Sequence, residues 1–273
     1  MKINKILSLV GISLLGLSLS ACNKPKDYSN HNPAVTANKM NKQDALKIMR
    51  KGFSSAQVEQ KLLLTNSNKK VPDQTISNQL IFGGKPTVVQ LQTQSTNGKK
   101  KQGMAMWVTD NKTYLLGKKN QYYYVDYAKF SGHNYADLLN ILINNYNITN
   151  PDPELVKAEK LTKHGEQYVL SAQLTDKAIM KNTANKIMTA LSQSRPQKMM
   201  FDAMNKEASF KTIYLKAVFQ QRQLVSYKET IVANLGKNMQ YNISEEYTNF
   251  NRFTNIKVPQ ETANAKKLPE KSK

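Results

Sequence analysis

The sequence predicts an α+β fold in which one mostly antiparallel β-sheet buries a face against helices. Three observations support this prediction. Apolar residues recur with a period of two over most of the chain, which is typical of strands with one buried face. Helical spacing is confined to a few segments, and turn residues separate consecutive strands, which favours antiparallel pairing.

The first expected element is an amphipathic helix at residues 41 to 53. Asn41 is suited to cap it, and Asp44 lies in the first turn, where the helix dipole favours an acid. Six strands are then expected, in an antiparallel meander. Asn97-Gly98 is a hairpin signal between the third and fourth strands. The expected strands are 58–64, 75–82, 89–94, 104–109, 113–117 and 121–126.

Helical spacing returns at residues 134 to 146, and the chain is then interrupted at Asn150 to Pro153. We interpret Asp152 and Glu154, which flank Pro153, as part of a solvated turn. A strand at 166–174 precedes two helices, and three long strands with Gln221-Arg222 and Gly236-Lys237 as turns close the domain. These elements are expected at 176–192, 196–207, 213–219, 225–235 and 239–247.

The N-terminus has the composition of a signal peptide. Lys2 and Lys5 precede an apolar run from Ile6 to Leu19, which is shorter than the roughly 20 residues that a membrane span needs. The run ends in Leu19-Ser20-Ala21-Cys22, which resembles the lipobox of bacterial lipoproteins at all four positions. The resemblance implies a diacylglyceryl group, with acyl chains such as palmitate, on Cys22. It places the protein on the extracytoplasmic face of the cell membrane, where two acyl chains anchor stably.

The chain is therefore divided into a signal peptide at 1–21, a flexible tether at 22–40, one domain at 41–261 and a disordered basic tail at 262–273. Cys22 is the only cysteine, so that no intramolecular disulfide can form. The domain must be stabilised by its core alone.

The protein is strongly basic, with a formal charge of +21. Loss of the signal peptide would remove Lys2 and Lys5 and no acid, which leaves +19. Such a field attracts polyanions, and outside the cytoplasmic membrane these are lipid headgroups and anionic wall polymers, with nucleic acid a poor candidate. A solvated basic surface without a dedicated anion site is the simpler interpretation.

No motif for catalysis is found in the sequence. It has no HExxH, CxxC, GxSxG or GxGxxG pattern, and no cofactor or metal is expected. Glu245 and Glu246 are adjacent on a strand, so that their side chains point to opposite faces and cannot act as a pair. The sequence therefore predicts a non-enzymatic protein.

The lipobox, the helix at Asp44 to Phe53 and the C-terminal hairpins together resemble uncharacterised Gram-positive lipoproteins with a LolA/LppX-like fold. Tyr247-Thr248-Asn249-Phe250-Asn251, leading to Ile256-Lys257-Val258-Pro259, carries most of the resemblance, which covers residues 41 to 265. It implies a curved antiparallel β-sheet, shaped as an incomplete barrel, with helices packed over its concave face. It also implies a lipid or acyl chain held between sheet and helices. Beyond Cys22 it transfers no functional residue.

The methionine side chain adapts to irregular shapes, so that several Met residues are candidates to line a ligand cavity, together with three apolar strand residues. A filled core is the simpler interpretation of each of them. The candidates are Met104, Met106, Met180, Met188, Met199, Met200, Met204, Ile213, Leu215 and Phe219.

Three hypotheses follow. The first is a carrier of a lipid or other amphiphile. The second is an envelope scaffold that binds a protein partner or an anionic wall polymer through its basic surface. The third is an enzyme whose site residues are far apart in the sequence. The first two rank close together, ahead of the third.

Overall fold

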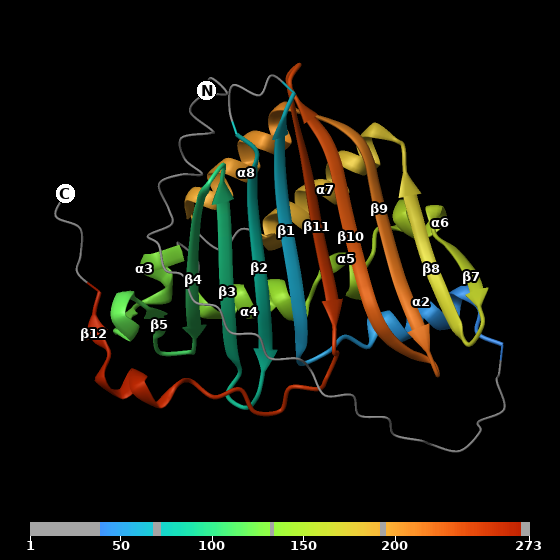
Figure 1. The fold of residues 1–273 in the computed structure, drawn as a ribbon. Helices are drawn as coiled ribbons and strands as arrows, with labels where there is room; N and C mark the ends of the chain where they lie inside the picture. Colours follow the sequence, from blue (N-terminus) through green and yellow to red (C-terminus); the bar gives the residue numbers. More distant parts are fainter. Residues whose placement is uncertain (1–38, 68–71, 132–133, 192–194, 269–273) are drawn as a thin grey trace.

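The computed structural model describes residues 39–67, 72–131, 134–191 and 195–268 (Figure 1). The predicted signal peptide, Cys22 and most of the predicted tether lie outside the described residues. Met40, which we expected at the end of the tether, is 5 % exposed and belongs to the core. The folded part therefore begins slightly earlier than predicted.

The described helices number nine, of which two are short 3-10 helices. They are α2 (Lys42–Arg50), η1 (Lys118–Asn120), α3 (Tyr127–Ser131), α4 (Tyr135–Ile143), α5 (Tyr146–Thr149), α6 (Pro153–Ala158), α7 (Lys177–Leu191), α8 (Arg195–Glu207) and η2 (Gln260–Asn264).

Twelve described strands form a single sheet (Figure 1). They are β1 (Ala56–Asn66), β2 (Gln74–Gly83), β3 (Val88–Asn97), β4 (Lys100–Val108), β5 (Thr113–Leu116), β6 (Tyr122–Val125), β7 (Lys160–His164), β8 (Gln167–Leu174), β9 (Ala208–Gln220), β10 (Gln223–Leu235), β11 (Met239–Thr248) and β12 (Lys266–Lys267).

The strand order is β12-β6-β5-β4-β3-β2-β1-β11-β10-β9-β8-β7, and neighbours are antiparallel except for the parallel pair β12 and β6. Because β12 and β7 lie at opposite ends of this order, the described sheet is open. The predicted α+β class with a curved, mostly antiparallel sheet is confirmed.

The sequence pattern explains which face of the sheet is buried. In β10 every second residue from Tyr227 to Leu235 is buried, and the residues between them are partly exposed. Successive side chains of a strand point to opposite faces, so that one face packs under the helices. We call this helix-covered side the inner face and the opposite side the outer face.

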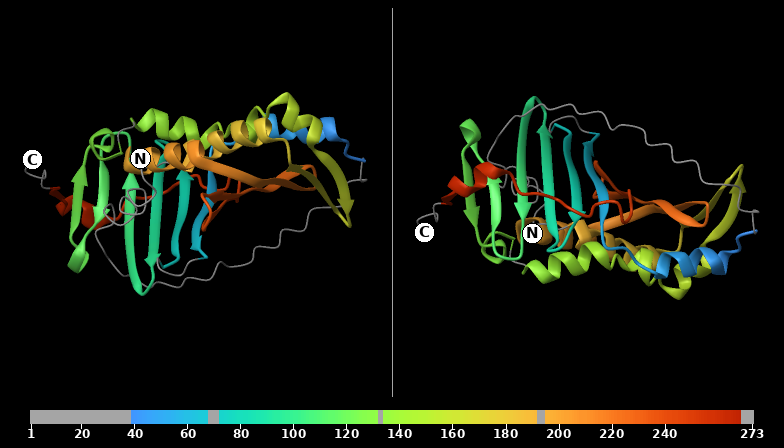
Figure 2. Two further views of the ribbon diagram at one scale, coloured as in Figure 1. Left: turned by 90° about the horizontal axis from the view of Figure 1, so that it is seen from above. Right: turned by 90° about the horizontal axis from the view of Figure 1, so that it is seen from below.

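The helices form a layer along one side of the sheet (Figure 2). One hydrophobic cluster joins the two layers, and it includes Met49 of α2, Leu142 of α4, Ile148 of α5 and Met180 of α7. Each large side chain of this kind contributes roughly 1.5–3 kcal/mol when it is removed from water. Burial of the inner face therefore positions the helices.

Capping residues fix where two of these helices begin. Asn41 accepts a hydrogen bond from the backbone N–H of Asp44 at 2.9 Å, and the Asp44 carboxylate accepts one from the backbone N–H of Asn41 at 3.2 Å. Asn134 and Asp137 form the same reciprocal box at the start of α4. The cap that the sequence predicted at Asn41 is confirmed, and the box at Asn134 adds a second.

The chain after β11 packs back against the ends of β1 and β2. The backbone N–H of Asn251 donates to the carbonyl of Ser55 at 2.8 Å, and that of Gly84 donates to the carbonyl of Phe253 at 3.2 Å. The ring of Phe250 meets that of Phe53 edge-on, with centroids 5.0 Å apart. The Tyr247 to Asn251 motif thus fastens the C-terminal segment to the sheet.

The structure corrects two predictions for loops and termini. Pro153 begins helix α6, and Asp152 makes an ion pair with Lys186, so that the predicted solvated turn at this point was wrong. The predicted disordered tail was wrong for residues 262 to 268, which include the end of η2 and strand β12. Among the described helices, none has the length and hydropathy that a membrane crossing requires.

Candidate functional site

The sheet register places five polar side chains in one row across the inner face. Glu229 of β10 lies opposite Glu245 of β11, which lies opposite Gln60 of β1. Gln60 in turn lies opposite Asn78 of β2, and Asn78 opposite Thr93 of β3. None of the five is more than 6 % exposed. We call them the polar row.

Apolar rows flank the polar row on both sides. One contains Tyr227, Tyr247, Val58, Leu80 and Leu91, and the other contains Ile231, Ile243, Leu62 and Ile76. Two sequence candidates stand at the ends of the polar row, because Leu215 lies opposite Glu229 and Met104 opposite Thr93. The inner face is therefore amphiphilic, with a polar band between apolar ones.

Neighbouring amides hold one oxygen of each carboxyl group. Gln60 Nε2 donates to Glu245 Oε1 at 2.7 Å, and Asn78 Nδ2 donates to Gln60 Oε1 at 3.1 Å. From the helical layer, Asn147 Nδ2 donates to Glu229 Oε1 at 3.2 Å. The two glutamates are therefore oriented by amide donors from both layers.

Glu229 and Glu245 are fully buried and directly opposed, a position in which two negative charges repel. Burial, followed by the charge of Glu245, raises the pKa of Glu229 to about 8. Burial raises the pKa of Glu245 to about 7, although hydrogen bonds with Gln60 and Tyr247 act to lower it. The pair therefore retains at least one proton near neutral pH.

Several polar atoms beside the pair have no partner with ordinary hydrogen-bond geometry among the described residues. They are Oε2 of Glu229, Oε2 of Glu245 and the hydroxyls of Tyr227 and Tyr247. Burial raises the pKa of both tyrosines well above 10, and the nearby glutamates raise it further. The hydroxyls are therefore neutral. Each interacts with a glutamate, Tyr227 with Glu229 and Tyr247 with Glu245, and its oxygen is able to accept one more hydrogen bond.

A third buried acid approaches this region from the end of α6. Burial raises the pKa of Glu159 to about 7, while the charge of Lys42 lowers it. Lys42 Nζ donates to the backbone carbonyl of Glu159 at 2.8 Å and also to that of Val156. The charge of Glu159 contributes to the raised pKa of Tyr227, so that this acid belongs to the same electrostatic environment.

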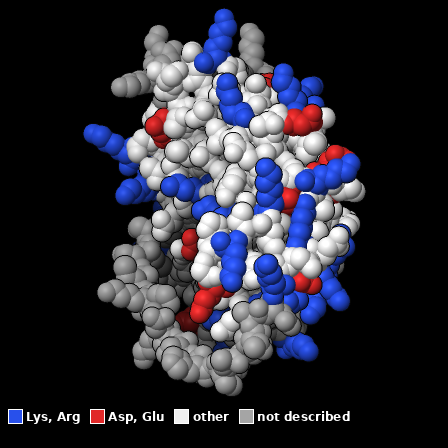
Figure 3. All heavy atoms as spheres, turned by 90° about the vertical axis from the view of Figure 1, so that its right-hand side faces the viewer, with Lys and Arg blue, Asp and Glu red and all other residues white. Residues whose placement is uncertain are grey.

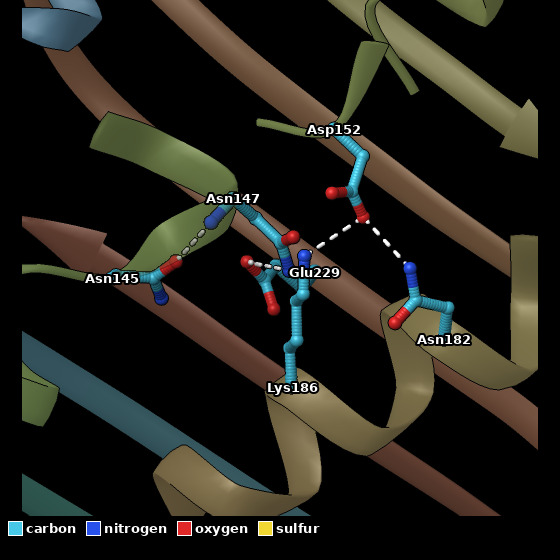
Figure 4. A network of polar contacts seen from close by, with 6 residues as sticks. All are labelled: Asn145, Asn147, Asp152, Asn182, Lys186 and Glu229. Atoms are coloured by element: carbon cyan, nitrogen blue, oxygen red, sulfur yellow. Dashed lines mark hydrogen bonds and ion pairs between the residues drawn. The ribbon is translucent and has the colours of Figure 1, made fainter. Parts of the chain in front are cut away.

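Polar contacts also tie together the helical layer above Glu229 (Figure 4). Asn145 caps α5 by accepting from the backbone N–H of Asn147 at 3.0 Å. Asp152 accepts from Lys186 Nζ at 2.8 Å and from Asn182 Nδ2 at 3.0 Å, which joins α7 to the start of α6. These contacts position the segment that covers the carboxyl pair.

The structure brings most of the predicted lining residues into the interior. Met106, Ile213, Leu215 and Phe219 are buried on strands, Met104 is partly buried, and Met180 and Met188 are buried on α7. Met199 is 52 % exposed and lies at the surface. The side chains of Met200 and Met204, both on α8, lie outside the described part. A ligand contact stays a prediction for all of them.

Sequence reasoning missed the carboxyl pair itself. Glu246 does point to the outer face, where it makes an ion pair with Lys228 at 3.1 Å. Glu245, however, meets Glu229 of the neighbouring strand. A signal was present, because Tyr227-x-Glu229-x-Ile231 and Ile243-x-Glu245-x-Tyr247 are mirror images on either side of one turn. Such a pattern aligns two acids on a buried face.

Most described basic side chains are exposed, and only Lys42, Lys186, Lys216 and Lys228 are half-buried. Lys and Arg side chains cover much of the side of the molecule that lies to the right in Figure 1 (Figure 3). The elements on that side carry the exposed bases Lys47, Arg50, Lys157, Lys160 and Lys163. The protein thus combines a basic surface with buried acids.

Fold and site define an α+β protein with an open sheet and a buried polar row under its helices. The chain belongs to the family of unknown function DUF6612, which matches residues 36–267. No curated protein matches the chain.

Similar solved structures include a LolA superfamily protein from Nitrosomonas europaea. Its sequence is 9 % identical and the TM-score is 0.26. The match covers 81 % of the chain described here and 94 % of the Nitrosomonas europaea chain. A DUF1329 family protein from Desulfovibrio piger has 7 % identity and a TM-score of 0.23 over the same shares.

Proposed function

We propose that this chain is a non-enzymatic lipoprotein that is anchored to the cell membrane through Cys22 and binds a lipid or other amphiphile between the inner face and the helices. The anchor rests on the Leu19-Ser20-Ala21-Cys22 pattern, and the extracytoplasmic location follows from it. The Gram-positive assignment belongs to the same proposal.

One observation carries the binding function: the inner face is amphiphilic and its polar row is incompletely paired. A buried polar atom without a partner costs roughly 1–3 kcal/mol, so that a ligand that supplies the partner is favoured. The apolar rows on both sides suit a hydrocarbon chain. An amphiphile matches both properties of the face.

Native mass spectrometry of residues 23–273, which contain every described element, tests this function. We expect a lipid or amphiphile to co-purify with the chain, or to bind after incubation with membrane lipids. A mass that stays at the apo value after both treatments would contradict the proposal.

Two neighbouring residues of β9 provide a matched pair of variants. Leu215→Trp adds volume to the inner face, whereas Tyr214→Trp changes the outer face, where Tyr214 is 38 % exposed. We expect Leu215→Trp to reduce the bound fraction and Tyr214→Trp to preserve it, with circular dichroism as the check that both variants fold. Equal binding by both would argue against an interior site.

The basic surface supports a second candidate function, the docking of an envelope protein or an anionic wall polymer. In this case, binding to a teichoic acid should weaken steeply as salt is added. The charge reversal Lys160→Glu/Lys163→Glu should reduce the affinity for the teichoic acid. The same reversal at Lys100 and Lys101, which are exposed on the distant strand β4, is the control.

A further inference from the structure

We propose that Glu229 and Glu245 form the binding site for a primary ammonium group on the head of the bound amphiphile. This inference rests on the proposed function and specifies the chemical class of the ligand. The site would be completed by the hydroxyls of Tyr227 and Tyr247, one position along the inner face.

The free atoms match the donors of a primary ammonium. Such a group has three N–H donors and no acceptor. The two glutamates each present Oε2 and the two tyrosines each present a hydroxyl oxygen, atoms that have no partner of ordinary geometry among the described residues. Each tyrosine interacts with the glutamate beside it, and its oxygen can still accept a hydrogen bond from a ligand. These four side chains are at most 1 % exposed, and they come from directly opposed positions of β10 and β11. They therefore lie next to one another on the buried inner face.

The amide donors beside the two glutamates hold Oε1 of each carboxyl group and not Oε2. Oε1 of Glu229 is held by Asn147 from the helical layer, and Oε1 of Glu245 by Gln60 from the sheet. Each carboxyl group thus has one oxygen that an amide orients. Its Oε2 has no partner with ordinary hydrogen-bond geometry, although Tyr227 and Asn145 also interact with Glu229, and Tyr247 with Glu245. A ligand nitrogen that reached both Oε2 atoms would complete the hydrogen bonding of both groups.

Electrostatics favours a cation over a neutral or anionic head. Two opposed buried carboxylates are unstable as a pair of negative charges, and without a cation they must retain a proton. An ammonium between them takes over the role of that proton and is itself paired and hydrogen-bonded, as a buried charge requires.

Two lysines of the helical layer, Lys42 and Lys186, are already engaged elsewhere. Lys42 donates to the carbonyls of Val156 and Glu159, and Lys186 makes its ion pair with Asp152. An external cation is therefore the natural partner of the carboxyl pair. The apolar rows on either side then receive the ligand's hydrocarbon chain.

Calorimetric titration of residues 23–273 with amphiphiles that share a dodecyl chain tests the inference. The probes are dodecylamine, dodecyl maltoside and dodecyl sulfate, each kept below its micellar concentration at near-neutral pH. We expect dodecylamine to bind about tenfold or more tightly than dodecyl maltoside. A close buried charge pair typically changes a dissociation constant by more than about tenfold.

Three variants show whether the carboxyl pair is responsible. Glu229→Gln, Glu245→Gln and the double variant should lose the preference for the ammonium while still binding the neutral amphiphile. Glu246→Gln, on the outer face of the same strand, should retain the preference. A preference that persists in the double variant would overturn the inference.

The wild-type protein alone gives a second readout that needs no variant. Titration in two buffers of different ionisation enthalpy should show the release of about one proton per ammonium bound, because the ligand replaces the shared proton. Equal affinity for all three heads without proton release would overturn the inference and leave the proposed function standing. Failure of all three to bind would overturn both.

Discussion

The pH dependence of folding stability tests whether Glu229 and Glu245 hold protons inside the folded chain. Burial raises the pKa of Glu229 to about 8 and that of Glu245 to about 7, from an ordinary value of 4.5. Between the ordinary and the raised values, the folded chain holds protons that the unfolded chain has released. The stabilisation is therefore complete below the ordinary value and is lost as the pH rises toward 7 and 8.

The size of the effect follows from the number of protons retained. Each one lowers the free energy of unfolding by about 1.4 kcal/mol per pH unit. A pair that holds between one and two protons gives a slope of about 1.4 to 2.7 kcal/mol per pH unit over this window. Glu159, whose pKa is raised to about 7, adds a slope of the same sign.

Urea unfolding followed by circular dichroism at a series of pH values measures these slopes. The wild type is compared with the double variant Glu229→Gln/Glu245→Gln. Glu159 contributes equally to the pH slope of the unfolding free energy in both proteins, so that its contribution cancels in the difference of the two slopes. The wild-type slope should be steeper by at least about 1.4 kcal/mol per pH unit. The control Glu246→Gln should match the wild type. Parallel lines for the wild type and the double variant would refute the assignment of raised pKa values to this pair.

Three further predictions concern other parts of the chain. Asn41→Ala removes the cap of α2 and should lower the free energy of unfolding by about 1 kcal/mol in urea. Gly83→Ala would bring a Cβ to 2.3 Å from the carbonyl oxygen of Phe253, whereas Gly165→Ala meets nothing within 4 Å. Both glycines have positive φ, so that Gly165→Ala should cost about 1 kcal/mol and Gly83→Ala clearly more; equal losses would contradict the packing argument. Cys22→Ser should move the protein from the membrane fraction to the soluble fraction, and an unchanged distribution on immunoblots would contradict the lipid anchor.

Local patterns in the sequence predicted most of the fold. The period of two located β1 to β6 and β8 to β11, with ends that differ from the observed ones by at most five residues, because each of these strands has one buried face. The hairpin signalled by Asn97-Gly98 was also predicted correctly, although its turn residues are Gly98 and Lys99, because Asn97 pairs with Lys100. Gly98 has a positive φ, which glycine adopts readily. These features depend on residues close together in the sequence, which is why sequence reasoning finds them.

Short elements that depend on tertiary contacts were missed. Strand β7 is mostly exposed and has no apolar alternation, so that only its pairing with β8 identifies it. The predicted helix at 134 to 146 ends earlier, because Asn145 caps the separate helix α5. Helix α6 begins at Pro153, inside the segment that we interpreted as a break. In each case a neighbouring element decides the structure.

The candidate site was missed for a similar reason. The predicted turn at Gly236-Lys237 implies a register that differs by one residue from the observed pairing of Leu235 with Met239. A shift of one residue moves every side chain to the other face, so that Glu229 and Glu245 would not have been matched. The partner amide on Asn147 comes from a helix that the sequence did not predict. Residues on three separate elements had to be placed before the site could be recognised.

Photo-crosslinking tests most directly whether an amphiphile lies between the sheet and the helices. The probe is an alkylamine with a diazirine in its chain, bound to residues 23–273, irradiated and mapped by peptide mass spectrometry. We predict adducts on the inner face of β9 to β11 and on α7, for example at Leu215 and Met188, which unlabelled dodecylamine should suppress. Adducts confined to outer-face residues such as Tyr214, or unaffected by the competitor, would contradict an interior binding site.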